Sequence, residues 1–230
     1  MPHTRMVYDM AEHQWRAVLG RASVQQQALV TELTGRITSH NGRMTELGHR
    51  ASVHCTRGCA RCCSMIFFVS PAEVEVIVFH LLENPALLNL FLAKVREREV
   101  RRLSCGDVWR RCQAATLSDD PALSAWYAQD IGCAFQAAGA CSIYPVRPLS
   151  CSLYNSIVPA EVCAVEPKSY ETEEMRTIHG ETRQWLAAMS AKRLPVSEFR
   201  LDVSYKVLER LMELTKETCP HMAAQDEKIP

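Results

Sequence analysis

The spacing of hydrophobic residues predicts helices at both ends of the chain. Between Met10 and about Leu47, apolar residues recur at helical spacing on a polar background, which is typical of one or two amphipathic helices. We expect breaks at Gly35 and at Asn41-Gly42, because these residues commonly interrupt a helix. The helical pattern resumes over residues 173–189 and 201–215.

A helical hairpin is predicted over residues 70–102. Ser70 is a favourable N-cap, Pro71 suits the first helical position, and Glu73 completes a capping box. The apolar residues that follow keep helical spacing as far as Asn84-Pro85, where the residue before proline avoids the helical conformation. A second helix is expected to fill the rest of this range.

The middle of the chain carries weaker signals. Residues 104–131 contain only a short expected helix ending near Trp126, and residues 132–167 are rich in glycine and proline. We therefore predict a mainly α fold, a single helical domain with an irregular, cysteine-rich centre and little β structure. It comprises an N-terminal helical segment (1–50), a cysteine-cluster core with the inserted hairpin (51–165), and C-terminal helices that pack on this core (166–230).

Composition and charge exclude several classes of partner. The chain has 230 residues, of which 47% are hydrophobic and 23% charged, as in ordinary globular proteins. Its 26 Lys and Arg residues balance 26 Asp and Glu residues, so no global field attracts it to nucleic acid or to an anionic membrane. The basic run 94–102 contains interleaved glutamates and indicates a solvated helix face rather than a phosphate track.

The same sequence indicates a cytoplasmic protein. The N-terminal residues lack the apolar core of a secretory signal, and no stretch of about 18 apolar residues occurs that would span a bilayer. In a reducing compartment, clustered cysteines are more often metal ligands or redox thiols than disulfides.

Cysteine placement is the most informative feature of this chain. Ten of the eleven cysteines fall within residues 55–163. The first group has the spacing C-x3-C-x2-C-C, which lets a tight turn at Gly58 direct several thiolates to one centre. The second group lies in the Gly- and Pro-rich segment that follows the hairpin. The candidate metal ligands are Cys55, Cys59, Cys62, Cys63, Cys133, Cys141, Cys151 and Cys163.

The remaining cysteines and the nearby histidines fit ordinary structural roles better. Cys105 and Cys112 are two helical turns apart and are expected to be buried thiols on one helix face. Cys219 is expected to be incidental. His49 and His54 precede the first cysteine group and are expected to be chance neighbours rather than ligands.

At these residues the chain resembles the YkgJ-type cysteine-cluster proteins, a family described as a zinc- or iron-chelating domain. The resemblance rests on CTRGCARCC at 55–63, CAF at 133–135 and GACSIYPVRPLSC at 139–151, and it covers roughly residues 50–165. It implies that the cysteines of these strings bind metal, with Cys163 a looser eighth member. The chain departs from the family pattern after Cys133, where Ala134-Phe135-Gln136 replaces Pro-Phe-Leu, and after Cys151, where Ser152 replaces a basic residue.

Both iron and zinc suit this ligand set. Cys55, Cys59 and Cys62 have the C-x3-C-x2-C spacing that binds a 4Fe-4S cluster in radical S-adenosylmethionine enzymes, and flagellin lysine methylase looks like a distant relative with such a cluster. Zn²⁺ held by four thiolates would instead be a structural site. The adjacent pair Cys62-Cys63 fits two neighbouring centres better than one ion. We expect an iron–sulfur cluster, with Zn²⁺ as the alternative.

Three arginines lie within or beside the cysteine motifs. Arg57, Arg61 and Arg147 are expected to donate hydrogen bonds to sulfur and to offset the negative charge of a thiolate-rich centre.

The predicted function is metal binding with a structural or redox role. One alternative is a protein-modifying, methyltransferase-like enzyme that uses the cluster beside S-adenosylmethionine, and another is a metal-delivery or thiol-redox protein. No nucleophile elbow, phosphate-binding loop or zinc-protease motif is present, so the sequence does not decide whether the chain is an enzyme. Its partner, a protein or a small molecule, is not identified.

Overall fold

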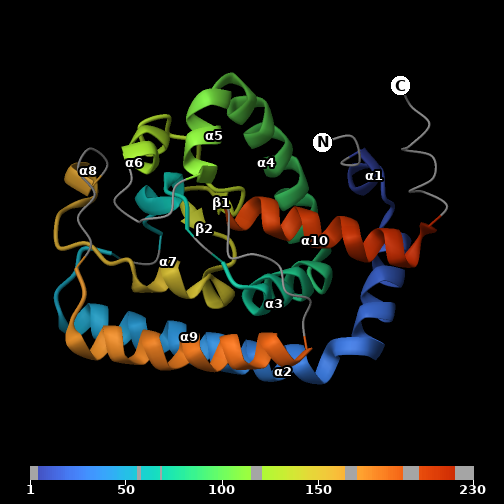
Figure 1. Cartoon of the computed structure of the whole chain (residues 1–230), viewed down its shortest axis with the longest axis horizontal. Helices are drawn as coiled ribbons and strands as arrows, with labels where there is room; N and C mark the ends of the chain where they lie inside the picture. The colour runs from blue at the N-terminus through green and yellow to red at the C-terminus, as the bar shows by residue number, and fades with distance from the viewer. Residues whose placement is uncertain are drawn as a thin grey trace.

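Two long helices, α2 (Glu12–Arg50) and α9 (Glu173–Arg193), run side by side along one edge of the molecule (Figure 1). The computed structural model describes residues 5–55, 58–67, 69–114, 121–163, 170–193 and 202–220. The shorter elements that precede the cysteine-rich middle are α1 (Arg5–Tyr8), the 3-10 helix η1 (Arg61–Ser64), α3 (Pro71–Leu82), α4 (Pro85–Ser104), α5 (Gly106–Ala114) and α6 (Pro121–Tyr127). They are followed by β1 (Gln136–Ala137), β2 (Ala140–Cys141), the 3-10 helix η2 (Tyr144–Val146), α7 (Leu149–Leu153), α8 (Ala160–Cys163) and α10 (Val203–Thr218). The predicted mainly α fold with little β structure is confirmed.

Helix α3 lies at the centre of the core. It contacts α2, α4, α9 and α10, and nearly every side chain on it is buried. The predicted capping box is present, because the Ser70 hydroxyl accepts from the backbone N–H of Glu73 at 3.3 Å and the Glu73 carboxylate accepts from the backbone N–H of Ser70 at 2.7 Å. The hairpin of α3 and α4 is therefore confirmed with the predicted start.

Helix α2 runs without a break from Glu12 to Arg50, so the breaks predicted at Gly35 and Asn41-Gly42 are wrong. Gly35 is exposed, and no neighbouring atom crowds the place of its missing side chain. The Asn41 side chain is buried and donates to the backbone carbonyls of Pro145 and Arg147, at 3.0 Å each. A tertiary contact thus uses the residue that local sequence rules assign to a turn.

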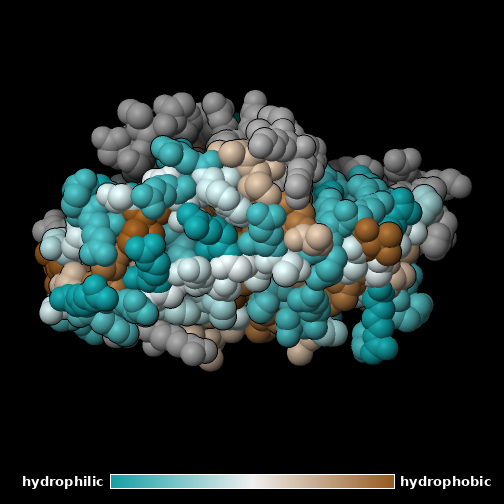
Figure 2. All heavy atoms as spheres, turned by 90° about the horizontal axis from the view of Figure 1, so that it is seen from below, coloured by the Kyte–Doolittle hydropathy of each residue, from teal (hydrophilic) through white to brown (hydrophobic). Residues whose placement is uncertain are grey.

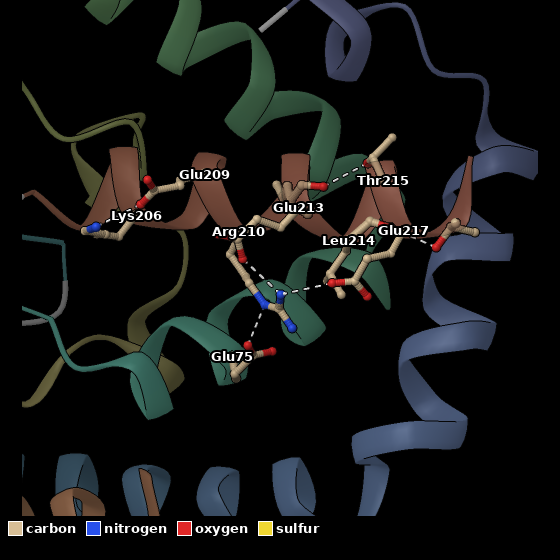
Figure 3. A network of polar contacts seen from close by, with 10 residues as sticks. Glu75, Lys206, Glu209, Arg210, Glu213, Leu214, Thr215 and Glu217 are labelled. Carbon is tan, nitrogen blue, oxygen red and sulfur yellow. Dashed lines mark hydrogen bonds and ion pairs between the residues drawn. The ribbon is translucent and has the colours of Figure 1, made fainter. Parts of the chain in front are cut away.

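Helix α10 crosses α3 and is joined to it by an ion pair. Arg210 of α10 reaches the buried Glu75 of α3, with 2.5 Å between Nε and Oε1, while Glu213 and Glu217 of the same helix lie on its other side (Figure 3). Burial raises the pKa of Glu75, and the Arg210 guanidinium opposes that shift. This contact fixes one side of the layer that covers α3.

The region between the hairpin and α9 is only partly as predicted. Residues 104–131 contain α5, which the hydrophobic pattern does not reveal, as well as the expected short helix α6. In the Gly- and Pro-rich segment, β1 and β2 pair antiparallel, with Gln136 opposite Cys141 and Ala137 opposite Ala140. Ala138 and Gly139 connect them with φ of 48° and 78°, the geometry of a two-residue type I′ turn.

The outer face formed near α2 and α9 is mainly hydrophilic, with hydrophobic residues showing in separate patches (Figure 2). Within the part of the chain that the structure describes, no single helix is long and apolar enough to cross a membrane. Helices α3 and α4 reach that length and apolarity only when counted together, and they are bent by 117°.

Candidate metal centre

Short irregular elements carry all eight candidate cysteines. Cys55 and Cys59 lie in the loop after α2, and Cys62 and Cys63 lie in η1. Cys133 precedes β1, Cys141 ends β2, Cys151 lies in α7, and Cys163 ends α8. Gly58 has a φ of +103°, so the turn between Cys55 and Cys59 has the left-handed backbone that glycine favours.

Backbone hydrogen bonds hold these segments together. The N–H of Cys133 donates to the carbonyl of Cys63 at 2.7 Å, which joins the two cysteine groups directly. The N–H of His54 donates to the carbonyl of Ser156 at 2.7 Å, and the N–H of Ser156 donates to the sulfur of Cys55 at 3.1 Å. The loop after α7 is therefore fixed against the first cysteine group.

Six of the candidate cysteines line one small cavity of about 50 Å³. They are Cys59, Cys62, Cys63, Cys133, Cys141 and Cys151. Apolar side chains, including Phe67, Phe135 and Ile143, complete most of the wall, and Arg147 and Asp202 are the charged residues in it. The fold thus gathers both sequence groups around a largely apolar space.

A second cavity of about 40 Å³ lies against the same cysteines. Cys55, Cys59, Cys62 and Cys151 line it, and the last three also line the first cavity, together with Tyr144 and Arg147. Gly48 of α2 forms part of its wall, and a side chain there would begin 3.1 Å from Val53 and 3.4 Å from Asn155. The two cavities share one wall of thiols, formed by Cys59, Cys62 and Cys151.

Cys62 and Cys63 interact through their side chains. The interaction with the Cys63 side chain lowers the pKa of Cys62, and the same interaction raises the pKa of Cys63. The positive charge of Arg147 also lowers the pKa of Cys62. Cys62 is therefore the thiol most easily deprotonated among those with a resolved shift, and it lines both cavities.

Burial acts in the opposite direction on the other thiols. It raises the pKa of Cys133 to about 12 and raises the pKa values of Cys55, Cys141, Cys151 and Cys163. Desolvation disfavours a thiolate when too few cations are nearby. At neutral pH these residues are neutral thiols, so binding a metal ion would release protons.

Of the three arginines predicted to donate to sulfur, Arg147 is the one that lies at the cysteine cavities. It lines both cavities, and its guanidinium lies 4.0 Å from the centre of the Tyr144 ring. Its Nε is buried and has no hydrogen-bond partner among the described residues. Its backbone carbonyl is held by Asn41 of α2. A buried donor without a partner is costly, and a thiolate or sulfide in either cavity would satisfy it.

The structure does not place the other two predicted arginines, Arg57 and Arg61, at the cysteine cavities. Arg61 lies in η1 and is exposed, and it lines an open groove rather than either small cavity. Arg57 lies outside the described residues.

A buried ion pair supports the centre from behind, and the sequence analysis did not identify it. Arg98 of α4 pairs with Asp202, which caps α10 by accepting from the backbone N–H of Ser204 at 3.0 Å. The Ser204 hydroxyl lies 3.5 Å from the sulfur of Cys133. Nothing in the sequence indicates this pair, because Arg98 stands in a run of charged residues on α4, most of which are not buried.

A buried carboxylate fixes Cys151 in the same way. Glu73 of α3 accepts from the backbone N–H of Leu149 at 2.7 Å, and so holds the first residue of α7. Burial raises the pKa of Glu73, and its hydrogen bonds from Ser70 and Leu149 oppose that shift. The capping box was predictable from sequence, but this second contact was not.

The remaining sequence predictions concern residues outside the two cavities. Cys163 lines neither cavity, although it is close enough to Cys59 and Cys62 for their charges to affect its pKa. Cys112 is buried and donates to the carbonyl of Ala122 at 2.9 Å, as expected of a structural thiol. Cys105 is only half-buried and caps the end of α4, whereas Cys112 lies in α5, so the prediction that both are buried on one helix face is wrong. Cys219 is buried at the end of α10.

Seven of the candidate cysteines lie around the two cavities, but their side chains do not form a metal-binding group. Among the residues that the structure describes, no three Cys, His, Asp or Glu side chains form a group that could hold an ion as they stand. The donor chemistry nevertheless fits a thiophilic metal, since thiols predominate and the wall is otherwise apolar. Side-chain rotation would be needed to bring four sulfurs to one point.

Comparison with known proteins adds no relative. No family model, no curated protein and no solved structure matches this chain.

Proposed function

We propose that this chain is a metal-binding protein that holds its metal through cysteine thiolates. The observation that carries the proposal is the convergence of seven cysteines, from separate segments, on two cavities that share Cys59, Cys62 and Cys151. Disulfides do not account for them, because all eleven cysteines are free in the structure. A chance collection of buried thiols would not be expected to meet at one wall with an unpartnered arginine.

The charges around the cavities favour a cationic occupant. Among the described residues, Arg147 is the only cation that lines either cavity, and several thiols around it are desolvated. A metal ion would supply the positive charge that stabilises thiolates in this setting, and its binding energy would add to the folding energy. Arg147 would then donate to sulfur and offset the remaining negative charge.

We assign an iron–sulfur cluster as the first candidate, bound by Cys55, Cys59 and Cys62 with a further thiol from the second group. Its support is the C-x3-C-x2-C spacing and the resemblance of the cysteine strings to the YkgJ-type family. Bound iron and sulfide would supply one-electron redox chemistry. The protein would work in a reducing compartment, for which we propose the cytoplasm, because free thiols persist there.

Zn²⁺ is the second candidate, and the cavity volumes favour it. About 50 Å³ and about 40 Å³ are each well below the roughly 150 Å³ of an apolar cavity that takes up a benzene molecule. A single ion requires only rotation of the thiols, whereas a multi-iron cluster requires the wall to move apart as well. Zinc would make the centre a structural one.

The test is the metal content of matched cysteine variants. We expect Cys59→Ser to lose both metal and solubility, because Cys59 lines both cavities. Cys219→Ser removes a buried thiol that lines neither cavity, and it should change neither property. A soluble Cys59→Ser protein that keeps the full metal content of the wild type would refute the assignment.

A further inference from the structure

An open groove of about 970 Å³ lies beside the cysteine cavities and is not explained by metal binding. Cys59 and Cys133 line both this groove and the 50 Å³ cavity, so a ligand in the groove would lie against the metal centre. Its volume is at the upper end of the range for small-molecule sites, about 300–1,000 Å³. An inorganic ion would leave most of it empty.

Cations from two elements line the groove. Lys94, Arg98 and Arg101 of α4 are four and then three positions apart and share one helix face, and Arg61 comes from η1. The charge pattern of this run predicts a solvated helix face. The structure places part of that face along an open, concave surface.

The groove cations are only partly neutralised. Lys94 pairs with Glu97 at 2.8 Å, and Arg98 pairs with Asp202 from behind. Arg101 donates to the backbone carbonyl of Asp130 at 2.8 Å rather than to a carboxylate. Asp130 is the other acidic residue in the wall, and its carboxylate accepts from the hydroxyl of Ser64 at 2.7 Å. Arg61 and Arg101 therefore remain without a carboxylate partner among the described residues.

Arg98 forms the buried inner part of the basic wall. Arg98 is only 3% exposed and lines the groove, and its Nη1 has no hydrogen-bond partner among the described residues. Its Nε and Nη2 are used by Gly132 and Asp202. Its guanidinium also lies over the rings of Trp126 and Tyr205, 5.5 Å and 5.1 Å from their centres, so a ligand in the groove would meet the exposed Arg61 and Arg101 instead.

Small residues leave room for that ligand. Gly58, Ala60, Ala128, Gly132, Ala137 and Gly139 contribute to the wall. Near Gly132 the space is already filled by the Gln136 side chain, whose Oε1 would lie 2.3 Å from an added Cβ. The groove is thus bounded by backbone and by a few long polar side chains.

We propose that this groove binds a small organic anion, through a carboxylate or phosphate group placed between Arg61 and Arg101, and presents it to the cysteine centre. The proposal goes beyond metal binding, since it assigns a ligand class to a surface that a purely structural metal site would not need. It holds for either metal.

Calorimetric titration of the purified protein with three probes tests this proposal. Phenyl phosphate carries a phosphate group on a phenyl ring, and benzoate carries a carboxylate on the same kind of ring. Benzyl alcohol is the neutral control. We expect saturable binding of at least one anion, with a Kd of about 1 mM or lower, and no measurable binding of the alcohol. Equal binding of the alcohol, or no saturation by either anion below about 10 mM, would overturn the proposal.

Matched arginine variants locate the site. We expect Arg61→Gln and Arg101→Gln each to weaken anion binding by about tenfold, since a charge-assisted hydrogen bond is lost. Arg110→Gln removes an exposed arginine of α5 outside the groove and should leave the affinity unchanged. Unchanged affinity in both groove variants would overturn the assignment. Metal content measured on the same samples separates failure of this inference from failure of the metal site.

Discussion

The backbone N–H of Cys133 donates to the carbonyl oxygen of Cys63 at 2.7 Å. This bond joins the cysteine group before the helical hairpin to the group that follows α6. Both residues line the 50 Å³ cavity, so the contact brings ligands from distant parts of the chain to one site. When two chain segments supply ligands to one metal site, the folding of each segment is expected to depend on the other.

The first prediction concerns that dependence. Cys62→Ser and Cys133→Ser, which remove one thiol from each group at the 50 Å³ cavity, should each reduce the metal content to a small fraction of the wild-type value, and the double variant should lose little more than either single variant. Residues that act in one site are not additive. Elemental analysis of the folded fraction measures the outcome. Two partial losses that simply add would place the cysteines in separate sites.

Removal of the Arg147 guanidinium should loosen the centre without abolishing it. Its buried Nε lies at the wall shared by both cavities. We expect Arg147→Gln to retain metal at purification but to release it to a chelator about 10 to 100 times faster, the usual effect of losing a residue that orients metal ligands. Arg43→Gln, an exposed change on α2, is the control. Identical release rates in the two variants would exclude the role of Arg147.

Loss of one partner of the buried pair Arg98–Asp202 should strongly destabilise the protein. Asp202→Ala leaves the guanidinium buried without its carboxylate and removes the cap of α10. We expect the free energy of unfolding to fall by about 3–5 kcal/mol. Asp107→Ala breaks an exposed pair with Arg110 and should leave stability nearly unchanged. Urea unfolding of both variants makes the comparison, and equal midpoints would contradict it.

His40 of α2 is buried, its ring centre lies 5.7 Å from that of His179 of α9, and this contact should make stability depend on pH. Burial lowers the pKa of His40 from 6.5 to about 4, and the charges of His179, Arg147, Arg36 and Arg43 act in the same direction. Between these two pKa values the unfolded chain binds a proton that the folded chain does not. Stability contributed by neutral His40 is therefore complete above pH 6.5 and is lost as the pH falls towards 4.

The size of this effect follows from the shift. We expect the wild type to lose about 2 kcal/mol more than His40→Gln between pH 7 and pH 5. Both proteins have the same cysteine site, so any pH dependence of stability that comes from this site cancels in the comparison. His13→Gln, an exposed change on α2, should keep the wild-type slope. A His40→Gln protein with that same slope would show that His40 titrates normally in the folded state.

The sequence predicted the helical elements well where their signals are local. The capping box at Ser70 and the proline at position 85 are read from a few adjacent residues, and the hairpin follows them. Asn41 shows the limit of such rules, because its side chain is used by carbonyls far along the chain. Helix α5 was missed since it is short and buries only part of one face.

The candidate site was predictable in its residues but not in its arrangement. Motif spacing identified the cysteines, and the structure gathers seven of the eight at two adjoining cavities. The shared wall, the pairing of Cys62 with Cys63 and the support from Asp202 and Ser204 depend on tertiary packing. Local sequence carries no information about such contacts.

The most direct test of the metal centre is elemental analysis of the protein purified without oxygen, combined with its absorption spectrum. We expect iron and acid-labile sulfide, with an absorption band near about 400 nm from sulfur-to-iron charge transfer. Zinc in a colourless protein would keep the thiolate site and replace the iron–sulfur assignment. A folded, metal-free protein in which all eleven cysteines react as free thiols would contradict the account.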